Sequence, residues 1–187
     1  MKPKVNIENM TYFLDFKQSL NIDERVAKKL GFEEMSTLNG FILSFENLKA
    51  KAMVFPSGKA FLSGIRSKKE LDYAFWTLIK KLKRVASLKL NPDIEIETQN
   101  ILASANLKEN FDTDFEINLE KLAMERYAQY EPEKFPGVFL KILSYEHERE
   151  RMLGTAIVFP SGKTLLGDIQ NINDAKLLLE KVIEKVR

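Results

Sequence analysis

Two segments of the chain share one pattern of hydrophobic and polar residues. Residues 52–65 read AMVFPSGKAFLSGI and residues 156–169 read AIVFPSGKTLLGDI, with nine of the 14 positions identical. In both, apolar residues alternate with other residues on either side of a Pro-Ser-Gly turn signal, which predicts two β-strands joined by a tight turn. A repeat of this kind indicates two copies of one structural unit.

A helix is predicted after each copy. Ser67 and Glu70 form a capping box, and the helical spacing of apolar residues continues to about Val85. Asn171 and Asp174 hold the equivalent positions before the second helix. The predicted apolar stripes are Leu71, Phe75, Leu78, Ile79 and Leu82 in the first helix, and Ala175, Leu178, Leu179, Val182 and Val186 in the second.

Upstream of each copy the likeness is weaker but continues. Asn9 and Asn100 each stand near the start of a predicted strand, and a short helix opened by an asparagine follows in each half. The chain therefore divides into a first repeat, residues 1–91, and a second repeat, residues 92–187. Since each helix has one apolar stripe to bury, we expect an α+β, pseudo-two-fold fold whose strands join in one curved sheet with four helices on one face.

The other face of this sheet bears on function. Apolar residues alternate there with the core positions, namely Met53, Phe55, Phe61, Leu102, Ile157, Phe159 and Leu165. If helices cover one face only, these side chains are exposed, and a broad exposed apolar patch marks a binding surface. The alternative is that they pack inside a two-layer or closed core, because periodicity does not assign short strands to a face.

Composition excludes several classes of protein. The chain has 187 residues, a mass of 21.6 kDa, no cysteine and one histidine, which excludes disulfides, thiolate metal sites and zinc sites built from several histidines. No run of 18 apolar residues and no signal peptide is present, so we expect a soluble protein with no membrane partner. We also expect it to lie inside the cell.

The net charge of +2 conceals an uneven distribution of charge. Residues 1–91 carry 17 basic and 9 acidic residues, whereas residues 92–187 carry 12 basic and 18 acidic residues. The first repeat is thus at +8 and the second at −6. Either different faces meet different partners, or this is ordinary solvated surface.

Motifs for catalysis and cofactor binding are incomplete. Gly162, Lys163 and Thr164 resemble the end of a phosphate-binding loop, but position 157 is Ile where that motif needs glycine. His147 lies in a charge run without a nucleophile motif. We therefore predict no catalytic residue, metal, cofactor or small-molecule substrate. An enzyme carrying such a fold as one domain is disfavoured because the two repeats use up the chain.

Residues 130–137 carry the most specific signal. They read YEPEKFPG, and two prolines and a glycine predict a rigid bent loop that holds Phe135 outward. Together with QNIL at 99–102 and FPSGK at 159–163, this segment resembles the TATA-box-binding protein family. The resemblance runs from about Val5 to Val186, is stronger in the second repeat, and indicates a divergent member.

The resemblance implies a saddle with a ten-stranded antiparallel sheet and four helices on its convex side. Its concave face would bind and bend double-stranded A·T-rich promoter DNA through the minor groove. A·T preference would follow because G·C pairs add an amino donor to that groove. The protein would be a non-enzymatic transcription initiation factor that recruits a transcription factor B-like protein.

Matching positions imply roles for individual residues. The DNA-facing residues would be the wedges Phe55, Phe135 and Phe159, the donors Asn9 and Asn100, the apolar floor Met53, Phe61, Leu102, Ile157 and Leu165, and the basic positions Lys59, Lys141 and Lys163. Glu131 and Glu133 match positions through which the family binds transcription factor B proteins.

The chain also departs from the family pattern. Leu38 stands at the fourth wedge position, Thr11 replaces a floor valine, Ser44 replaces an arginine, Ser63 and Gly167 replace threonines, Asp168 replaces a glycine and Gln170 replaces a lysine. Ser63 still forms hydrogen bonds, so we include it and Leu38 among the DNA-binding residues. The departures keep a second hypothesis open, a protein-interaction or regulatory module with weak or lost TATA selectivity.

Overall fold

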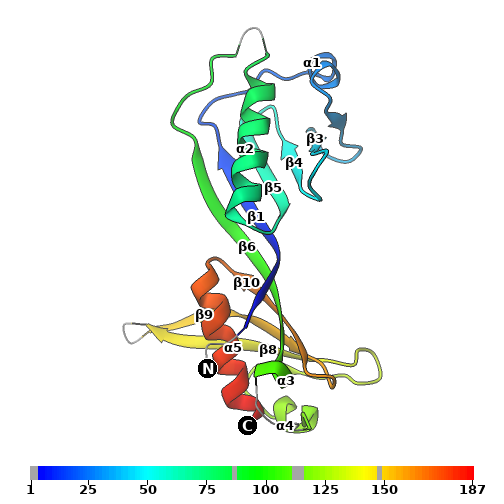
Figure 1. Cartoon of the computed structure of the whole chain (residues 1–187), viewed down its shortest axis with the longest axis vertical. Coiled ribbons are helices and arrows are strands. Elements are labelled where there is room, and N and C mark those ends of the chain that lie inside the picture. The colour runs from blue at the N-terminus through cyan, green and yellow to red at the C-terminus, as the bar shows by residue number, and fades with distance from the viewer. Residues whose placement is uncertain (1–3, 86–87, 111–115, 147–148) are drawn as a thin grey trace. The chain divides into compact units, whose positions relative to one another are not determined.

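A computed structural model describes residues 4–85, 88–110, 116–146 and 149–187, and its strands form a ten-stranded antiparallel sheet (Figure 1). This confirms the predicted fold class. Contacts between residues divide the chain into two compact units. We call residues 9–99 the first-repeat unit, and residues 1–8 with 100–187 the second-repeat unit.

The first-repeat unit holds one half of the strand order, β2-β3-β4-β5-β1. Its elements along the chain are β1 (Asn6–Asp15), α1 (Glu24–Lys29), β2 (Glu33–Glu34), β3 (Phe41–Ser44), β4 (Lys51–Val54), β5 (Lys59–Ile65) and α2 (Lys68–Leu82). Only residues 6–8 of β1 belong to the second-repeat unit. As predicted, Ser67 caps α2 by accepting a hydrogen bond from the Glu70 amide at 3.2 Å. The helix ends at Leu82, three residues before the predicted end.

The second-repeat unit holds the other half of the order, β6-β10-β9-β8-β7. Its elements are β6 (Glu95–Asn106), α3 (Leu107–Asn110), α4 (Leu119–Ala123), β7 (Ala128–Gln129), β8 (Val138–Glu146), β9 (Arg149–Val158), β10 (Lys163–Ile169) and α5 (Ile172–Val186). Residues 95–99 of β6 belong to the first-repeat unit. As predicted, Asn171 caps α5, because its Oδ1 atom accepts a hydrogen bond from the Asp174 amide at 2.8 Å.

The described part of the chain has five helices, so the expectation of four is wrong. The additional helix is α3, a single turn that follows β6 directly. The Leu107 amide fixes it by donating to the Gly162 carbonyl oxygen at 2.9 Å. Four residues are too few to show helical periodicity in a sequence.

The repeated Phe-Pro-Ser-Gly-Lys segments form the predicted tight turns. In the first, the Phe55 amide donates to Lys59 O at 2.9 Å and the Gly58 amide donates to Phe55 O at 3.0 Å. Gly58 has φ +91°, and a Cβ there would lie 1.7 Å from Gln18 O, so only glycine fits. The Phe159 and Gly162 amides make the same bonds in the second turn, at 3.0 and 2.9 Å.

One helix covers one face of the strands in each unit (Figure 1). Helix α2 buries Ala74, Leu78, Ile79 and Leu82 against strands that include β5, and α5 buries all five residues of its predicted stripe against β8, β9 and β10. Side chains on the opposite face are partly exposed, such as Leu102 at 38%. The closed-core alternative is therefore wrong for the units as described.

None of the helices that the structure describes is long and apolar enough to cross a lipid bilayer.

Candidate nucleic-acid interface

We use "open face" for the side of each unit's strands that lies opposite its long helix. In the first-repeat unit, Met53 pairs with Phe61 on one side and Ile42 on the other, so these side chains share that face. A hollow of about 260 Å³ lies there, lined by Asn9, Ile42, Lys49, Lys51, Met53, Ser63 and Gly64. The predicted residues Asn9, Met53 and Ser63 thus come together.

The open face of the second-repeat unit has a matching apolar row. Ile157 pairs with Phe139 and with Leu165, and Leu165 pairs with Ser104. Leu102 lies two residues before Ser104 and so on the same face. The predicted floor residues Leu102, Ile157 and Leu165 are therefore neighbours, and Phe139 extends the row.

Asn9 and Asn100 occupy equivalent sites, each beside a shift in strand register. Asn9 Oδ1 accepts a hydrogen bond from the Gly64 amide at 2.7 Å. Asn100 Oδ1 accepts one from the Ile169 amide at 3.3 Å. Because the carbonyl oxygens are used in this way, the Nδ2 groups remain as hydrogen-bond donors. Donors of this kind match the acceptors adenine N3 and thymine O2 in the minor groove.

The predicted wedge phenylalanines belong to aromatic clusters. Phe135 lies 5.6 Å from Phe159 and 5.0 Å from Phe139 between ring centroids, and its side chain is half-buried. In the first-repeat unit Phe55 lies 6.4 Å from Phe61 in an edge-to-face arrangement. The sequence predicted Phe135 to point outward, but its neighbouring rings cover part of it.

A glycine lies beneath the rings in each unit. A Cβ at Gly137 would lie 2.9 Å from Phe135 Cε1 and 3.3 Å from Phe159 Cδ1, and one at Gly40 would lie 2.9 Å from Phe55. Neither glycine has a positive φ, so close approach of the rings explains the residue. Leu38, two residues before Gly40, is 55% exposed in its loop.

The predicted basic positions lie along the same strands. Lys59 and Lys163 begin β5 and β10 and are exposed, and Lys141 on β8 lies directly opposite Thr155. Lys59 also pairs in register with Asp15. The Lys17 amide donates to Asp15 Oδ1 at 2.8 Å, which lowers the pKa of that carboxyl below its usual value.

Two carboxylates also reach the open face of the second-repeat unit. Thr155 Oγ1 donates to Asp168 Oδ2 at 2.6 Å, and Ser104 Oγ donates to Glu8 Oε1 at 2.5 Å. Each acid is exposed. The sequence singled out Asp168 but not its bond to Thr155, which depends on a pairing between two strands. Glu8 escaped notice because nothing in its local sequence distinguishes it.

The loop that precedes β8 carries Glu131 and Glu133. Both are exposed, Glu131 forms an ion pair with Lys134, and its carbonyl oxygen accepts the Phe135 amide at 2.9 Å. The loop is therefore a hydrogen-bonded turn that holds the two acids beside the Phe135 cluster.

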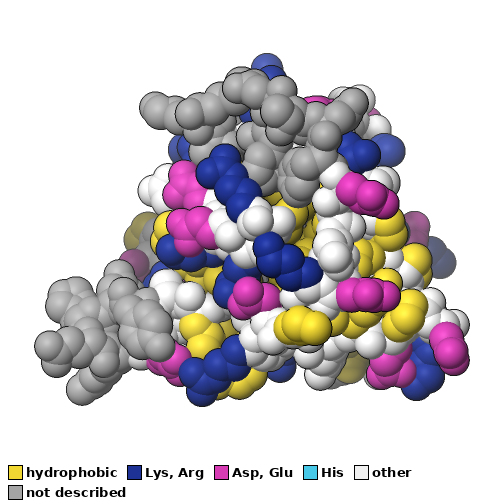
Figure 2. All heavy atoms as spheres, turned by 90° about the horizontal axis from the view of Figure 1, so that it is seen from below, with side chains coloured by type: hydrophobic (Ala, Val, Ile, Leu, Met, Phe, Trp, Pro, Cys, Tyr) yellow, Lys and Arg dark blue, Asp and Glu magenta, His cyan; other side chains and the backbone are white. Residues whose placement is uncertain are grey.

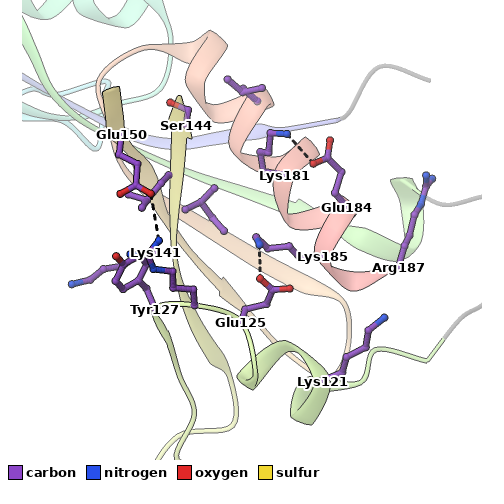
Figure 3. Close-up of a pocket in the computed structure, with 14 residues that line it drawn as sticks. Lys121, Glu125, Tyr127, Lys141, Ser144, Glu150, Lys181, Glu184, Lys185 and Arg187 are labelled. Atoms are coloured by element: carbon purple, nitrogen blue, oxygen red, sulfur yellow. Dashed lines mark hydrogen bonds and ion pairs between the residues drawn. The ribbon is translucent and has the colours of Figure 1, made fainter. Parts of the chain in front are cut away.

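A larger pocket of about 920 Å³ lies in the second-repeat unit where α5, β8 and the segment after α4 meet, and the predicted DNA-binding residue Lys141 is among the residues that line it (Figure 3). Lys185 pairs with Glu125 at 2.5 Å and Lys181 with Glu184 at 2.9 Å, while Arg126 lies 4.6 Å from the Tyr127 ring centroid. Figure 2, which views the molecule of Figure 1 from below, likewise shows basic and acidic side chains mixed among hydrophobic ones on that surface. Much of this positive charge is thus compensated within the chain.

Comparison with known proteins gives a consistent result. The sequence matches the family described as transcription factor TFIID (or TATA-binding protein, TBP) over residues 4–85 and 95–187. The chain belongs to the TATA-box-binding protein family. The TATA-box-binding protein of Sulfurisphaera tokodaii is 31% identical over 99% of this chain and 87% of its own length. That of Methanocaldococcus jannaschii is 28% identical over 100% and 96%.

A solved structure shows the same fold. Methanococcus jannaschii TBP superposes with a TM-score of 0.77 at 29% identity, covering 98% of each chain. The family resemblance drawn from the repeat and from residues 130–137 is thereby confirmed. The roles of individual residues stay predictions.

We predict that Gly137→Ala disturbs the aromatic cluster. The new methyl group must displace the Phe135 ring, so the free energy of unfolding should fall by roughly 1–2 kcal/mol. Denaturant unfolding and the NMR shifts of the ring protons measure this effect. Gly167→Ala is the control, because its methyl group meets only Leu102 Cδ1, at 3.9 Å. Equal losses in both variants would contradict the proposed crowding.

Proposed function

We propose that this protein is a DNA-binding transcription initiation factor that binds A·T-rich promoter DNA through the minor groove and bends it. The observation that carries the proposal is the paired geometry of Asn9 and Asn100, whose carbonyl oxygens are occupied by backbone amides so that their NH₂ groups remain as donors. The relatives named TATA-box-binding protein support the same function.

The remaining open-face residues suit this ligand. Apolar side chains such as Met53 and Leu165 match the floor of a widened minor groove, which displays few polar groups at A·T pairs. The phenylalanine rings unstack base steps at a cost of a few kcal/mol per step, which the added contact with bent DNA offsets. Lys59, Lys141 and Lys163 contribute phosphate contacts, whose strength falls with added salt.

Titration of labelled DNA tests this proposal. An A·T-rich duplex is titrated by fluorescence anisotropy at about 50 and 200 mM salt, with an unlabelled G·C duplex as competitor. We expect binding that weakens at the higher salt concentration and resists the competitor. Absence of binding at low salt would reject the proposal.

A second function is favoured by the carboxylates of Glu8 and Asp168. Negative charge on an open face opposes DNA and suits a protein ligand, as in a regulatory module that has lost TATA selectivity. The same titration separates the two hypotheses, because such a module binds neither duplex at low salt.

Phe135→Ala should weaken binding of the A·T-rich duplex by about tenfold or more, because stacking of an aromatic ring on a base contributes roughly 1–3 kcal/mol. Bending, followed by energy transfer between dyes at the two DNA ends, should also decrease. Leu71→Ala on α2 serves as control, since this half-buried side chain lies away from the open face. Unchanged DNA affinity in Phe135→Ala would remove this residue from the interface.

We further propose that the exposed acids Glu131 and Glu133 bind a transcription factor B-like protein. Their loop is fixed by backbone hydrogen bonds next to a predicted wedge, so a partner bound there would lie beside the bent DNA. Exposed carboxylates on an ordered turn favour a basic surface on that partner.

Glu131→Arg should reduce formation of the ternary complex by about tenfold while DNA affinity stays unchanged or rises, because the charge reversal repels a basic partner. Gel shifts with the labelled A·T-rich duplex and a purified transcription factor B protein measure both quantities. Glu180→Arg makes the same charge change on the exposed side of α5 and should have little effect. Loss of DNA binding in Glu131→Arg alone would refute this division of roles.

A further inference from the structure

The open face of the second-repeat unit carries a carboxylate, Asp168, at the position where the first-repeat unit has Gly64. Thr155 pairs with Gly167, and Asp168 follows in the left-handed conformation at φ 56°. Thr155 Oγ1 donates to Asp168 Oδ2 at 2.6 Å, which holds the carboxylate over this face. In the part of the chain that the structure describes, Asp168 Oδ1 accepts no hydrogen bond.

Gly167 leaves free space beside this carboxylate. A Cβ at that position would contact only Leu102 Cδ1, at 3.9 Å, and its φ is not positive. Neither crowding nor backbone strain therefore requires glycine here. Glycine here leaves open space on the open face, beside Leu102 and the paired Thr155.

Open space next to an acceptor has a specific complement in the minor groove. A·T pairs present only acceptors there, and the single donor in that groove is the N2 amino group of guanine, which also protrudes from its floor. We infer that Gly167 and Asp168 recognise guanine at one position of the binding site, with Gly167 making room for the amino group and Asp168 Oδ1 accepting its hydrogen. This inference rests on the proposed minor-groove function.

The equivalent site in the first-repeat unit is built differently. Lys51 pairs there with Ser63, whose hydroxyl lies 3.2 Å from Thr11 Oγ1, and Gly64 follows with φ 84°. A Cβ at Gly64 would lie 2.9 Å from Ala50 Cα, so this glycine is required by the fold. The hollow of about 260 Å³ that Lys51, Ser63 and Gly64 line in the first-repeat unit therefore has no carboxylate at the position of Asp168.

This difference between the repeats would determine the orientation in which the DNA binds. A binding site with A·T pairs throughout fits two similar units in either orientation. A single guanine accepted by one unit only would select one orientation. Repulsion between Asp168 and the phosphates lowers affinity for every sequence, whereas recognition of the amino group depends on the base, so measurement can separate the two effects.

Modified bases test the inference directly. In an A·T-rich duplex each base pair in turn is replaced by G·C, by inosine·C, which lacks the amino group, and by 2,6-diaminopurine·T, which adds it to an A·T-like pair. At one position we expect G·C and diaminopurine·T to bind roughly tenfold more tightly than inosine·C, as for a hydrogen bond to a charged group. At the remaining positions the amino group should weaken binding.

Two variants locate the effect. Asp168→Gly should abolish the advantage of the amino group while leaving affinity for the A·T duplex unchanged or higher. Gly167→Ala should abolish this advantage by filling the space that the glycine leaves open. Glu8→Gln is the matched control, because it removes another acid from the same face and should keep the advantage.

The outcomes are distinguishable. Binding of the A·T duplex without an advantage of the amino group at any position would overturn this inference and leave the proposed function standing. Persistence of the advantage in Asp168→Gly would also overturn it. Failure to bind the A·T duplex at low salt would overturn both.

Discussion

One-sided covering of the strands is the constraint on which the rest of the structure depends. Side chains alternate between the two faces of a strand, so a helix that packs on one face fixes which residues remain on the other. In the second-repeat unit, Ala156 and Val158 are buried on the helix side, and Thr155 and Ile157 therefore belong to the open face. A shift of one residue would exchange these sets and destroy both the core and the candidate interface.

Much of this arrangement follows from local sequence. The repeated Phe-Pro-Ser-Gly-Lys segment forms one turn in each unit. Because side chains alternate along the strands on either side of the turn, it places Met53 and Phe61 on the open face of the first-repeat unit and Ile157 on that of the second. The capping patterns predict the starts of α2 and α5 because a cap acts within four residues. These features depend on neighbours in the chain, which is why a single sequence reveals them.

Features that depend on pairing between distant strands escaped sequence reasoning. Gly137 lies beneath the rings of Phe135 and Phe159, although Phe159 is 22 positions away in the sequence. The bond from Thr155 to Asp168 and the bond from Ser104 to Glu8 likewise require the register of the sheet. Resemblance to a family identified Asp168 as unusual, but only the structure shows what holds it.

The conformation of Asp168 clarifies how an acid persists at this position. The left-handed region costs a non-glycine residue roughly 1 kcal/mol, although aspartate tolerates it better than most residues. The hydrogen bond from Thr155 to the exposed carboxylate offsets part of that cost within the chain itself. The hydrogen bond thus orients the carboxylate without DNA, and its other oxygen stays available for a ligand. A side chain fixed in this way loses little conformational entropy on binding, and such preorganisation favours selectivity over adaptation.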